Sequence, residues 1–162
     1  MSRLAIFGLL LALLAGCASA DRDYWQPTPE VAQAPDLARI HFYRPSVAFM
    51  WAAEPQVIVN ERRVGHLRNG ETFYRDARPG RYRIYLVGAE DDALEVALRP
   101  GDRIYVKADI AWRVLGFRFV AEPASAAQAE PEIATLRQVT GLESDLRRSN
   151  RPPPDLDPRP DI

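Results

Sequence analysis

Side chains that could carry out chemistry are scarce in this chain of 162 residues. Cys17 is the only cysteine, so an intramolecular disulfide is excluded, and His41 and His66 are the only histidines. A structural zinc site needs a cluster of cysteine and histidine ligands, which the sequence does not offer. Neither histidine stands in a motif that pairs it with a nucleophile or a carboxylate. The sequence therefore predicts no catalytic residue, no metal ligand and no cofactor, and it favours a protein that is not an enzyme.

The N-terminal segment predicts export from the cytoplasm. Arg3 gives the chain a basic start, and residues 4–15 form an apolar run that ends in small residues. These are the parts of a secretory signal peptide. As a helix, twelve residues would reach only about 18 Å, whereas the hydrocarbon core of a bilayer is about 30 Å thick. We therefore expect residues 1–16 to be a signal peptide rather than a transmembrane helix.

The end of this run, Leu14-Ala15-Gly16-Cys17, resembles the lipobox of bacterial lipoproteins. The resemblance implies that a signal peptidase recognises Leu14, Ala15 and Gly16 and cleaves before Cys17. It also implies a diacylglyceryl thioether and an N-acyl group on Cys17, and two or three acyl chains anchor a protein firmly to a bilayer. Ala18, rather than an aspartate, follows the cysteine, which by the same resemblance implies the outer membrane, facing the periplasm. Retention at the inner membrane, or a host with one membrane, is the alternative.

The composition agrees with a globular domain between two tails. Apolar residues make up 47% of the chain and the net charge is −1, so wholesale disorder and a general attraction to nucleic acid are excluded. Residues 17–36 contain three prolines and predict a linker behind the lipidated cysteine. Residues 151–162 contain five prolines and predict an exposed, semi-extended tail.

Residues 37–122 predict an antiparallel β-sandwich of about seven short strands. Apolar residues alternate with polar ones in six segments, which indicates strands with one solvent-facing side each. The apolar members are Ile40 and Phe42; Val57 and Val59; Tyr82, Ile84 and Leu86; Leu94, Val96 and Leu98; Ile104, Val106, Ala108 and Ile110; and Leu115, Phe117 and Phe119. Asn60-Glu61 predicts a hairpin turn, and Pro79-Gly80 and Pro100-Gly101 predict turns with glycine at a positive φ.

Residues 123–150 predict a connector and a short helical segment. Ile133, Leu136, Val139, Leu142 and Leu146 recur at near-helical spacing, and Pro131 suits a first helical turn. We expect one interrupted helix or two short ones over residues 131–149. The alanine-rich residues 121–130 are interpreted as a connector.

The order of segments in the predicted domain resembles a bacterial lipoprotein family whose module is known only as a domain of unknown function. The resemblance covers about residues 37–122 and implies a lipid-anchored extracytoplasmic β-sandwich without implying an activity. The segments that carry it are Ala38-Arg39-Ile40-His41-Phe42-Tyr43-Arg44-Pro45, Val57-Ile58-Val59-Asn60, Arg63-Val64-Gly65-His66-Leu67, Asn69-Gly70, Arg78-Pro79-Gly80-Arg81-Tyr82 and Leu98-Arg99-Pro100-Gly101-Asp102-Arg103-Ile104-Tyr105-Val106.

Candidate binding residues come from two parts of the sequence. Residues 47–53 are an apolar run between two prolines, and they are interpreted as a buried strand, with an apolar loop that docks to lipid or to a partner as the alternative. Phe49, Trp51 and Trp112 form a candidate binding surface if they are exposed. Arg81 and Arg83 belong to an arginine-rich stretch that is either a basic binding face or a mixed soluble surface. His41 and His66 are interpreted as solvated surface residues, and the acidic residues 90–92 as a solvated turn.

These observations favour a membrane-anchored lipoprotein of the bacterial cell envelope that acts as a non-enzymatic interaction or structural module. Its expected partners are the lipid bilayer, through the lipid on Cys17, and an envelope protein or glycan, but not a nucleic acid. Two alternatives stay open. One is a small-ligand-binding lipoprotein with an apolar, aromatic pocket lined by Phe49, Trp51 or Trp112, and the other is an enzyme that uses His41 or His66.

Overall fold

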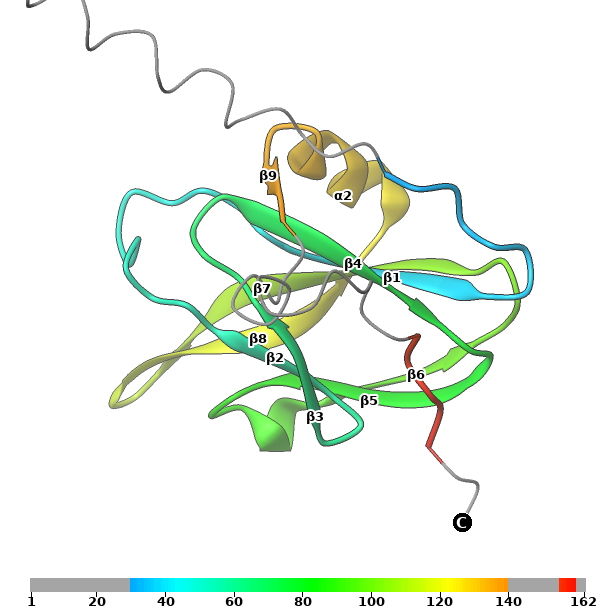
Figure 1. Cartoon of the computed structure of the whole chain (residues 1–162). Coiled ribbons are helices and arrows are strands. Elements are labelled where there is room, and N and C mark those ends of the chain that lie inside the picture. The colour runs from blue at the N-terminus through cyan, green and yellow to red at the C-terminus, as the bar shows by residue number, and fades with distance from the viewer. Residues whose placement is uncertain (1–29, 140–154, 160–162) are drawn as a thin grey trace, which may run out of the picture.

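The computed structural model describes residues 30–139 and 155–159 and places about half of them in two β-sheets that pack face to face (Figure 1). One sheet contains β1 (Ala38–Arg44), β4 (Glu71–Ala77), β7 (Arg103–Arg113), β8 (Gly116–Ala124) and β9 (Arg137–Gln138). The other contains β2 (Gln56–Val59), β3 (Arg62–His66), β5 (Gly80–Leu86) and β6 (Leu94–Leu98). The strand orders are β8-β7-β1-β4-β9 and β3-β2-β5-β6. The predicted mainly-β sandwich is confirmed, with nine strands in the described residues rather than about seven.

The hairpin of β2 and β3 forms where the sequence predicts it. Asn60 and Glu61 have φ values of 47° and 63°, the left-handed backbone of the two-residue turns whose twist matches that of paired strands. The Asn60 side-chain oxygen accepts a hydrogen bond from the backbone N–H of Arg83 at 2.9 Å, which ties the turn to β5. Gly101 has a φ of 81°, as the predicted Pro-Gly turn before β7 requires.

Strand β1 lies in the middle of the five-stranded sheet and differs from the prediction in two ways. All seven of its residues are buried, so the expected solvent-facing side is wrong for this strand. It also pairs in parallel with β7, from Arg39 beside Arg103 to Tyr43 beside Lys107, where antiparallel pairing is predicted. Alternation shows that a strand has two chemically different faces. It does not show whether another segment covers the polar face or which way a neighbouring strand runs.

The polar face of β1 is covered by the segment before it and by the helix α2 (Ala126–Ile133). Arg39 is 1% exposed and forms ion pairs with Asp76 of β4 and with Glu30, each with its closest nitrogen–oxygen distance at 2.6 Å. Tyr43 packs in a small cluster with Ala129 of α2. The end of the predicted linker, from Glu30 onward, is therefore held against the sheet.

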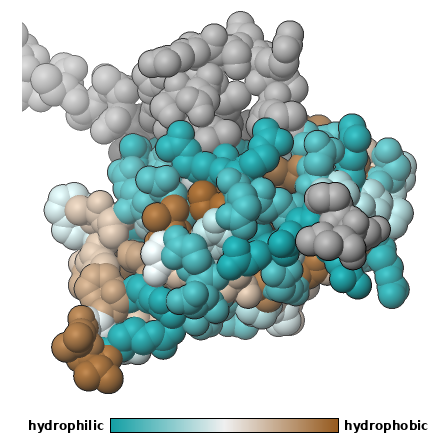
Figure 2. Space-filling view, turned by 90° about the horizontal axis from the view of Figure 1, so that it is seen from below, coloured by the Kyte–Doolittle hydropathy of each residue, from teal (hydrophilic) through white to brown (hydrophobic). Residues whose placement is uncertain are grey.

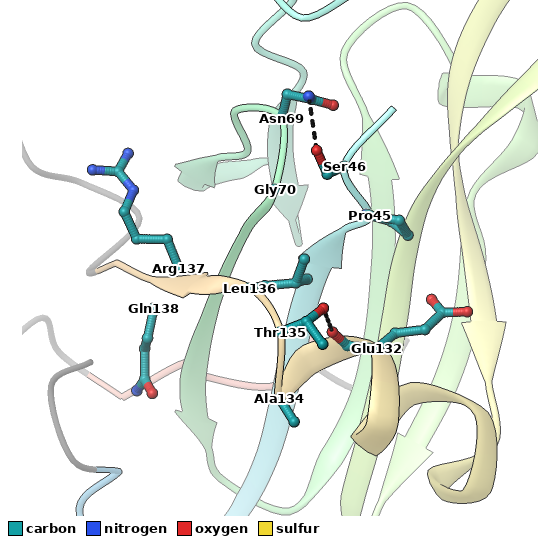
Figure 3. Close-up of a pocket in the computed structure, with 10 residues that line it drawn as sticks. All are labelled: Pro45, Ser46, Asn69, Gly70, Glu132, Ala134, Thr135, Leu136, Arg137 and Gln138. Carbon is teal, nitrogen blue, oxygen red and sulfur yellow. Dashed lines mark hydrogen bonds between the residues drawn. The ribbon is translucent and has the colours of Figure 1, made fainter. Parts of the chain in front are cut away.

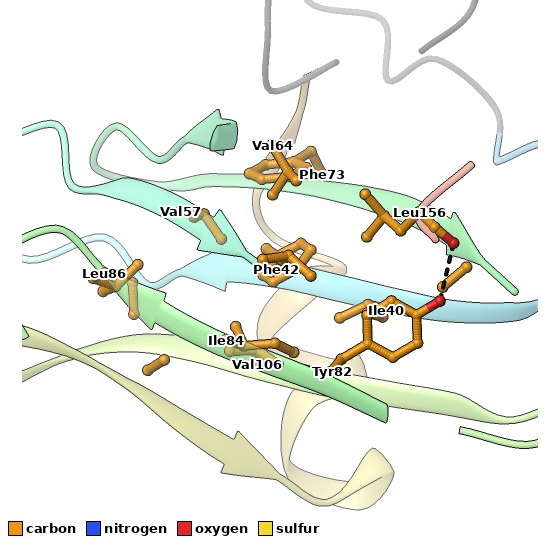
Figure 4. Packing of buried hydrophobic residues seen from close by; sticks show 14 of the residues in the cluster. Ile40, Phe42, Val57, Val64, Phe73, Tyr82, Ile84, Leu86, Val106 and Leu156 are labelled. Carbon is orange, nitrogen blue, oxygen red and sulfur yellow. Dashed lines mark hydrogen bonds between the residues drawn. The ribbon is translucent and has the colours of Figure 1, made fainter. Parts of the chain in front are cut away.

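The main core lies between the two sheets (Figure 4). Phe42 of β1 and Phe73 of β4 stack with ring centroids 5.0 Å apart. Tyr82 of β5 points into the same core, where burial raises the pKa of its hydroxyl to about 12. The single proton of that hydroxyl is shared between the carbonyl oxygens of Arg78 at 2.6 Å and Leu156 at 2.9 Å. The core is thus closed at one end by a residue from the C-terminal tail.

The prediction of an exposed tail is wrong at Leu156, although Asp155, Asp157 and Arg159 beside it are exposed. Leu156 is 9% exposed and belongs to the main core. Its backbone N–H donates to the carbonyl of Asp76 at 2.9 Å, and its carbonyl accepts from the N–H of Arg78 at 3.0 Å. Proline content excludes a helix or a central strand here, but it does not prevent the tail from packing on the sandwich. The one leucine among the prolines is the residue in the sequence that indicates such packing.

The position of the helix also differs from the prediction. α2 begins inside the segment interpreted as a connector, after Ser125, whose side chain caps it by accepting from the N–H of Gln128 at 3.3 Å. Pro131 lies inside this helix rather than in the first turn of a later one. The high helix propensity of alanine outweighs the weak apolar periodicity of this segment. Residues 140–149 of the predicted helix lie outside the described residues.

Candidate functional site

The hairpin of β7 and β8 projects beyond the rest of its sheet. β1 pairs with β7 only as far as Lys107, whereas β7 continues to Arg113. Six further residues, at about 3.3 Å each, extend the hairpin by about 20 Å past the last β1 pair. In Figure 1 this hairpin points away from the sandwich at the lower left. We refer to residues 112–117 as the hairpin tip.

One face of this hairpin is an apolar ladder that continues outward from the core. Ile110 pairs with Phe119 and Trp112 with Phe117 across the two strands, and residues two apart share a face. Nearest the sheet, Ala108 and Ala121 are buried. Exposure then rises along the ladder to the tip.

The turn that joins the two strands is wholly apolar at its apex. Val114 and Leu115 are each 100% exposed. The predicted strand that includes Leu115 is wrong at this residue, which lies in the turn just before β8. In Figure 2 the most hydrophobic side chains on the visible face project at the left edge, where this hairpin ends in Figure 1. An exposed apolar group of this kind marks an interaction site more often than isolated surface residues do.

The neck of the hairpin is braced by the opposite sheet. Asp92, in the single turn η3 (Glu90–Asp92) between β5 and β6, forms ion pairs with Arg113, at 2.8 Å, and with Arg118. These two arginines lie on either side of Val114 and Leu115 in the sequence and share one carboxylate. Opposite charges at the neck therefore hold the hairpin in place.

Residues 47–53 form a loop, so their interpretation as a buried strand is wrong and the alternative of an apolar loop describes the structure. Trp51 is 73% exposed and Phe49 is 52% exposed. The loop connects β1 and β2 at the same end of the sandwich as the hairpin tip (Figure 1). Proline at both ends of the segment removes backbone donors that a central strand would need.

The buried guanidinium of Arg44 holds this loop in one conformation. It donates hydrogen bonds to the carbonyls of Met50, at 2.7 Å, and Ala53, and burial lowers its pKa. The amide of Asn69 completes the attachment, because its oxygen accepts from the N–H of Val47 at 2.9 Å and its nitrogen donates to the Val47 carbonyl at 3.0 Å. The aromatic side chains are thus displayed by a fixed backbone.

A row of side-chain contacts connects the loop to the hairpin tip. The Arg44 guanidinium lies 4.7 Å from the centroid of the Phe119 ring. Phe119 lies edge-on to Phe117, with ring centroids 6.5 Å apart, and Phe117 lies edge-on to Trp112 at 5.9 Å. These contacts connect the backbone of the loop, through Arg44, to the aromatic row of the hairpin, and they do not involve the side chains of Phe49 and Trp51.

The other predicted site residues lie elsewhere. Arg81 and Arg83 are on the outward face of β5, and Arg83 is paired with Glu61 at 2.9 Å, which fits the mixed soluble surface better than a basic binding face. Cys17 and the preceding Leu14, Ala15 and Gly16 lie outside the described residues.

Four residues of this end were missed as functional candidates. Leu115 and Phe117 are predicted as apolar members of a strand, and the sequence pattern assigns no role to Val114 or Arg44. The available signal for the tip was two adjacent aliphatic residues directly before Gly116, because glycine after a short run is a turn signal.

His41 is buried, so its interpretation as a solvated residue is wrong. It is 5% exposed and stacks on Tyr105 with ring centroids 5.1 Å apart. Burial, followed by the positive charges of Arg103 and Arg39, lowers its pKa to about 4 against the opposing charge of Glu30. Its Nε2 lies 3.7 Å from the Glu30 carboxylate, and within the described residues it has no hydrogen-bond partner. This is a neutral, packed imidazole under the N-terminal segment.

A surface cavity of about 720 Å³ lies between the end of β1, the β3–β4 connection and the segment from α2 to β9 (Figure 3). Leu136 points into it, and the Asn69 side chain donates to the hydroxyl of Ser46 at 3.3 Å on one wall. Its lining is Pro45, Ser46, Asn69, Gly70, Glu132, Ala134, Thr135, Leu136, Arg137 and Gln138. None of the three aromatic residues predicted to line a pocket is among them.

The described residues offer neither a membrane-spanning helix nor a metal-binding cluster. Within residues 30–139 and 155–159, no helix is long and apolar enough to cross a membrane. The same residues contain no group of three or more histidine, cysteine and carboxylate side chains arranged to hold a metal ion.

The fold and the site define a class of protein: a two-sheet β-sandwich in which one hairpin carries the hydrophobic face out into solvent. The chain belongs to the family described as "Protein of unknown function (DUF2846)", whose model matches residues 34–116, about half of the chain. The matched region runs from just before β1 to the hairpin tip. Comparison with curated proteins and comparison with solved structures give no match.

Proposed function

We propose that this chain is a lipid-anchored lipoprotein of the bacterial cell envelope and that its sandwich domain is a non-enzymatic interaction module. The observation that carries the interaction role is the braced hairpin tip, whose two apex residues are fully exposed aliphatic side chains. Exposing such a surface to water is thermodynamically unfavourable, and contact with another apolar surface removes that cost in free energy. The Leu14-Ala15-Gly16-Cys17 motif at the end of a signal-type run supports the anchor.

The lipid anchor and the exposed hairpin tip act together in this proposal. A tether confines the domain to a thin layer next to the membrane, which raises its effective concentration toward any envelope component there. A small apolar surface that binds weakly from solution is then sufficient. The role requires no catalytic group, and the buried, neutral His41 serves the packing of β1. Ala18 after the cysteine supports the outer membrane, facing the periplasm, as the site of attachment.

The experiment that tests this proposal replaces the thiol. Cells that express the full chain are fed labelled palmitate, and their membranes are separated from soluble fractions and by density. We expect the wild-type chain to incorporate the label and to sediment with the outer membrane, and Cys17→Ser to do neither. Ser19→Ala, two residues away, is the matched control and keeps both properties. Incorporation of label in Cys17→Ser at the wild-type level refutes the anchor.

The rival ligand-binding role has less support. The surface cavity is large enough for a small molecule, since ligand pockets begin at about 300 Å³, but its described lining contains no aromatic side chain. The exposed aromatic residues instead lie on a projecting surface. A projecting surface fits against a partner and does not enclose a ligand.

A further inference from the structure

We propose that the hairpin tip docks into the headgroup region of the bilayer to which the chain is anchored. This inference rests on the proposed lipid anchor and names the partner of the same surface. Three features favour the bilayer as the partner of the hairpin tip: the shape of the tip, the arginines beside its apex and the length of the tether.

The shape of the tip suits insertion better than docking into a protein. Val114 and Leu115 form a convex apex with no described neighbour around it, because both are fully exposed. Trp112 and Phe117 stand one step behind the apex as a cross-strand pair. Tryptophan is enriched at membrane interfaces, where its ring is apolar and its N–H stays hydrated. The aliphatic side chains of the apex would therefore lie nearest the acyl chains, and the aromatic pair behind them would lie at the level of the headgroups.

The two charged side chains that flank the apex in the sequence are basic. Arg113 and Arg118 both pair with the carboxylate of Asp92, and the charge of Glu90 in the same turn also acts on Arg118, so the neck as a whole carries no excess of positive charge. Guanidinium groups directly behind the apex suit the headgroup region of a bilayer, because they donate charge-assisted hydrogen bonds to phosphate oxygens.

The tether allows the tip to reach the bilayer. Glu30 is held to the sheet by its ion pair with Arg39, so the connection to Cys17 is thirteen residues long and spans at most about 45 Å. Glu30 also pairs with Arg103 at the start of β7, and the apex lies eleven residues further along that strand, about 36 Å away. The tether is therefore long enough for the domain to turn with its hairpin toward the lipid.

The test places a probe at the apex and reads its contact with acyl chains. The full chain, purified from cells in detergent, is reconstituted into vesicles of phosphatidylethanolamine and phosphatidylglycerol whose acyl chains carry bromine. A nitrobenzoxadiazole dye is attached to Leu115→Cys or, as a second apex variant, to Val114→Cys. Both positions are fully exposed, so substitution leaves the fold intact. Val31→Cys, an exposed aliphatic position away from the hairpin, is the matched control.

We expect bromine to quench the dye at either apex position at least about threefold more than at position 31. Equal quenching at the apex and at position 31 overturns the proposal. A benzophenone on the same cysteine, in the same vesicles, identifies the alternative: a crosslink to a second copy of the chain, with no lipid adduct, also overturns the proposal. The wild-type chain tests the lipid anchor separately from the docking of the tip. Its only thiol, Cys17, stays unlabelled by the dye if it carries a lipid and is labelled if it does not.

Discussion

Replacing Leu156 by alanine tests whether the C-terminal tail is part of the folded domain. Leu156 is 9% exposed and fills the end of the main core beside Tyr82. Truncating a buried leucine to alanine costs about 2–5 kcal/mol, and the cost depends on how far the site can collapse. Because the tail is a peripheral segment that can relax, we expect the lower part of this range, about 2–3 kcal/mol. For a domain of this size, that corresponds to a fall in Tm of about 10 °C.

The chain supplies its own control for this substitution. Leu115→Ala makes the same chemical change at a fully exposed position, where we expect a change of at most about 0.5 kcal/mol. Thermal unfolding of the purified full-length variants, followed by far-UV circular dichroism, measures both. The reasoning is refuted if Leu156→Ala and Leu115→Ala have the same Tm, because the tail would then contribute nothing to the core.

Two further predictions concern a glycine and a buried histidine. Gly80 has a φ of 147°, and a Cβ placed there would lie 2.2 Å from the Cβ of Pro158. In urea unfolding, Gly80→Ala should therefore lose about 1–3 kcal/mol more stability than the control Gly88→Ala, because Gly88 has a φ of 88° but an open site. Equal losses in the two variants would contradict the docked tail. His41 has a folded-state pKa of about 4, below the ordinary value of about 6.5, so the unfolded chain takes up the proton first as the pH falls. Stability is fully present above pH 6.5 and declines by up to about 3 kcal/mol as the pH falls toward 4. His41→Phe removes this contribution, and an unchanged dependence of Tm on pH in that variant would show that the imidazole is not buried as a neutral group.

Local pattern was sufficient to predict most strands of this fold. Val57 and Val59, and Tyr82 and Ile84, alternate with polar neighbours, and both pairs are buried in the core. Alternation is a property of consecutive residues, so it needs no knowledge of the partner strand. The hairpin turn at Asn60 is equally local, because it depends on a residue type that tolerates a positive φ.

What could not be predicted depends on contacts between distant segments. Arg39 and His41 are polar residues in an alternating strand, and their burial depends on the segment at Glu30 and on the rings of Tyr74 and Tyr105, which come from distant parts of the chain. Leu156 is one leucine among prolines, and its burial depends on a gap beside β4 that the sequence does not describe. For the site, the sequence indicates Trp112 as a candidate because exposed tryptophan is rare. It does not indicate Leu115, because the exposure of Leu115 arises only from β7 and β8 extending past the end of β1.

The lipid on Cys17 is the central claim, and intact mass spectrometry of the protein extracted from cells tests it most directly. We predict a chain that begins at Cys17 and carries the mass of a diacylglyceryl group and an amide-linked acyl chain. After alkaline hydrolysis of the two ester-linked chains, the mass should fall by two fatty acyl groups, each replaced by a hydrogen, while the acyl amide remains. A chain that begins at Met1, or one whose Cys17 thiol is unmodified, would contradict the account.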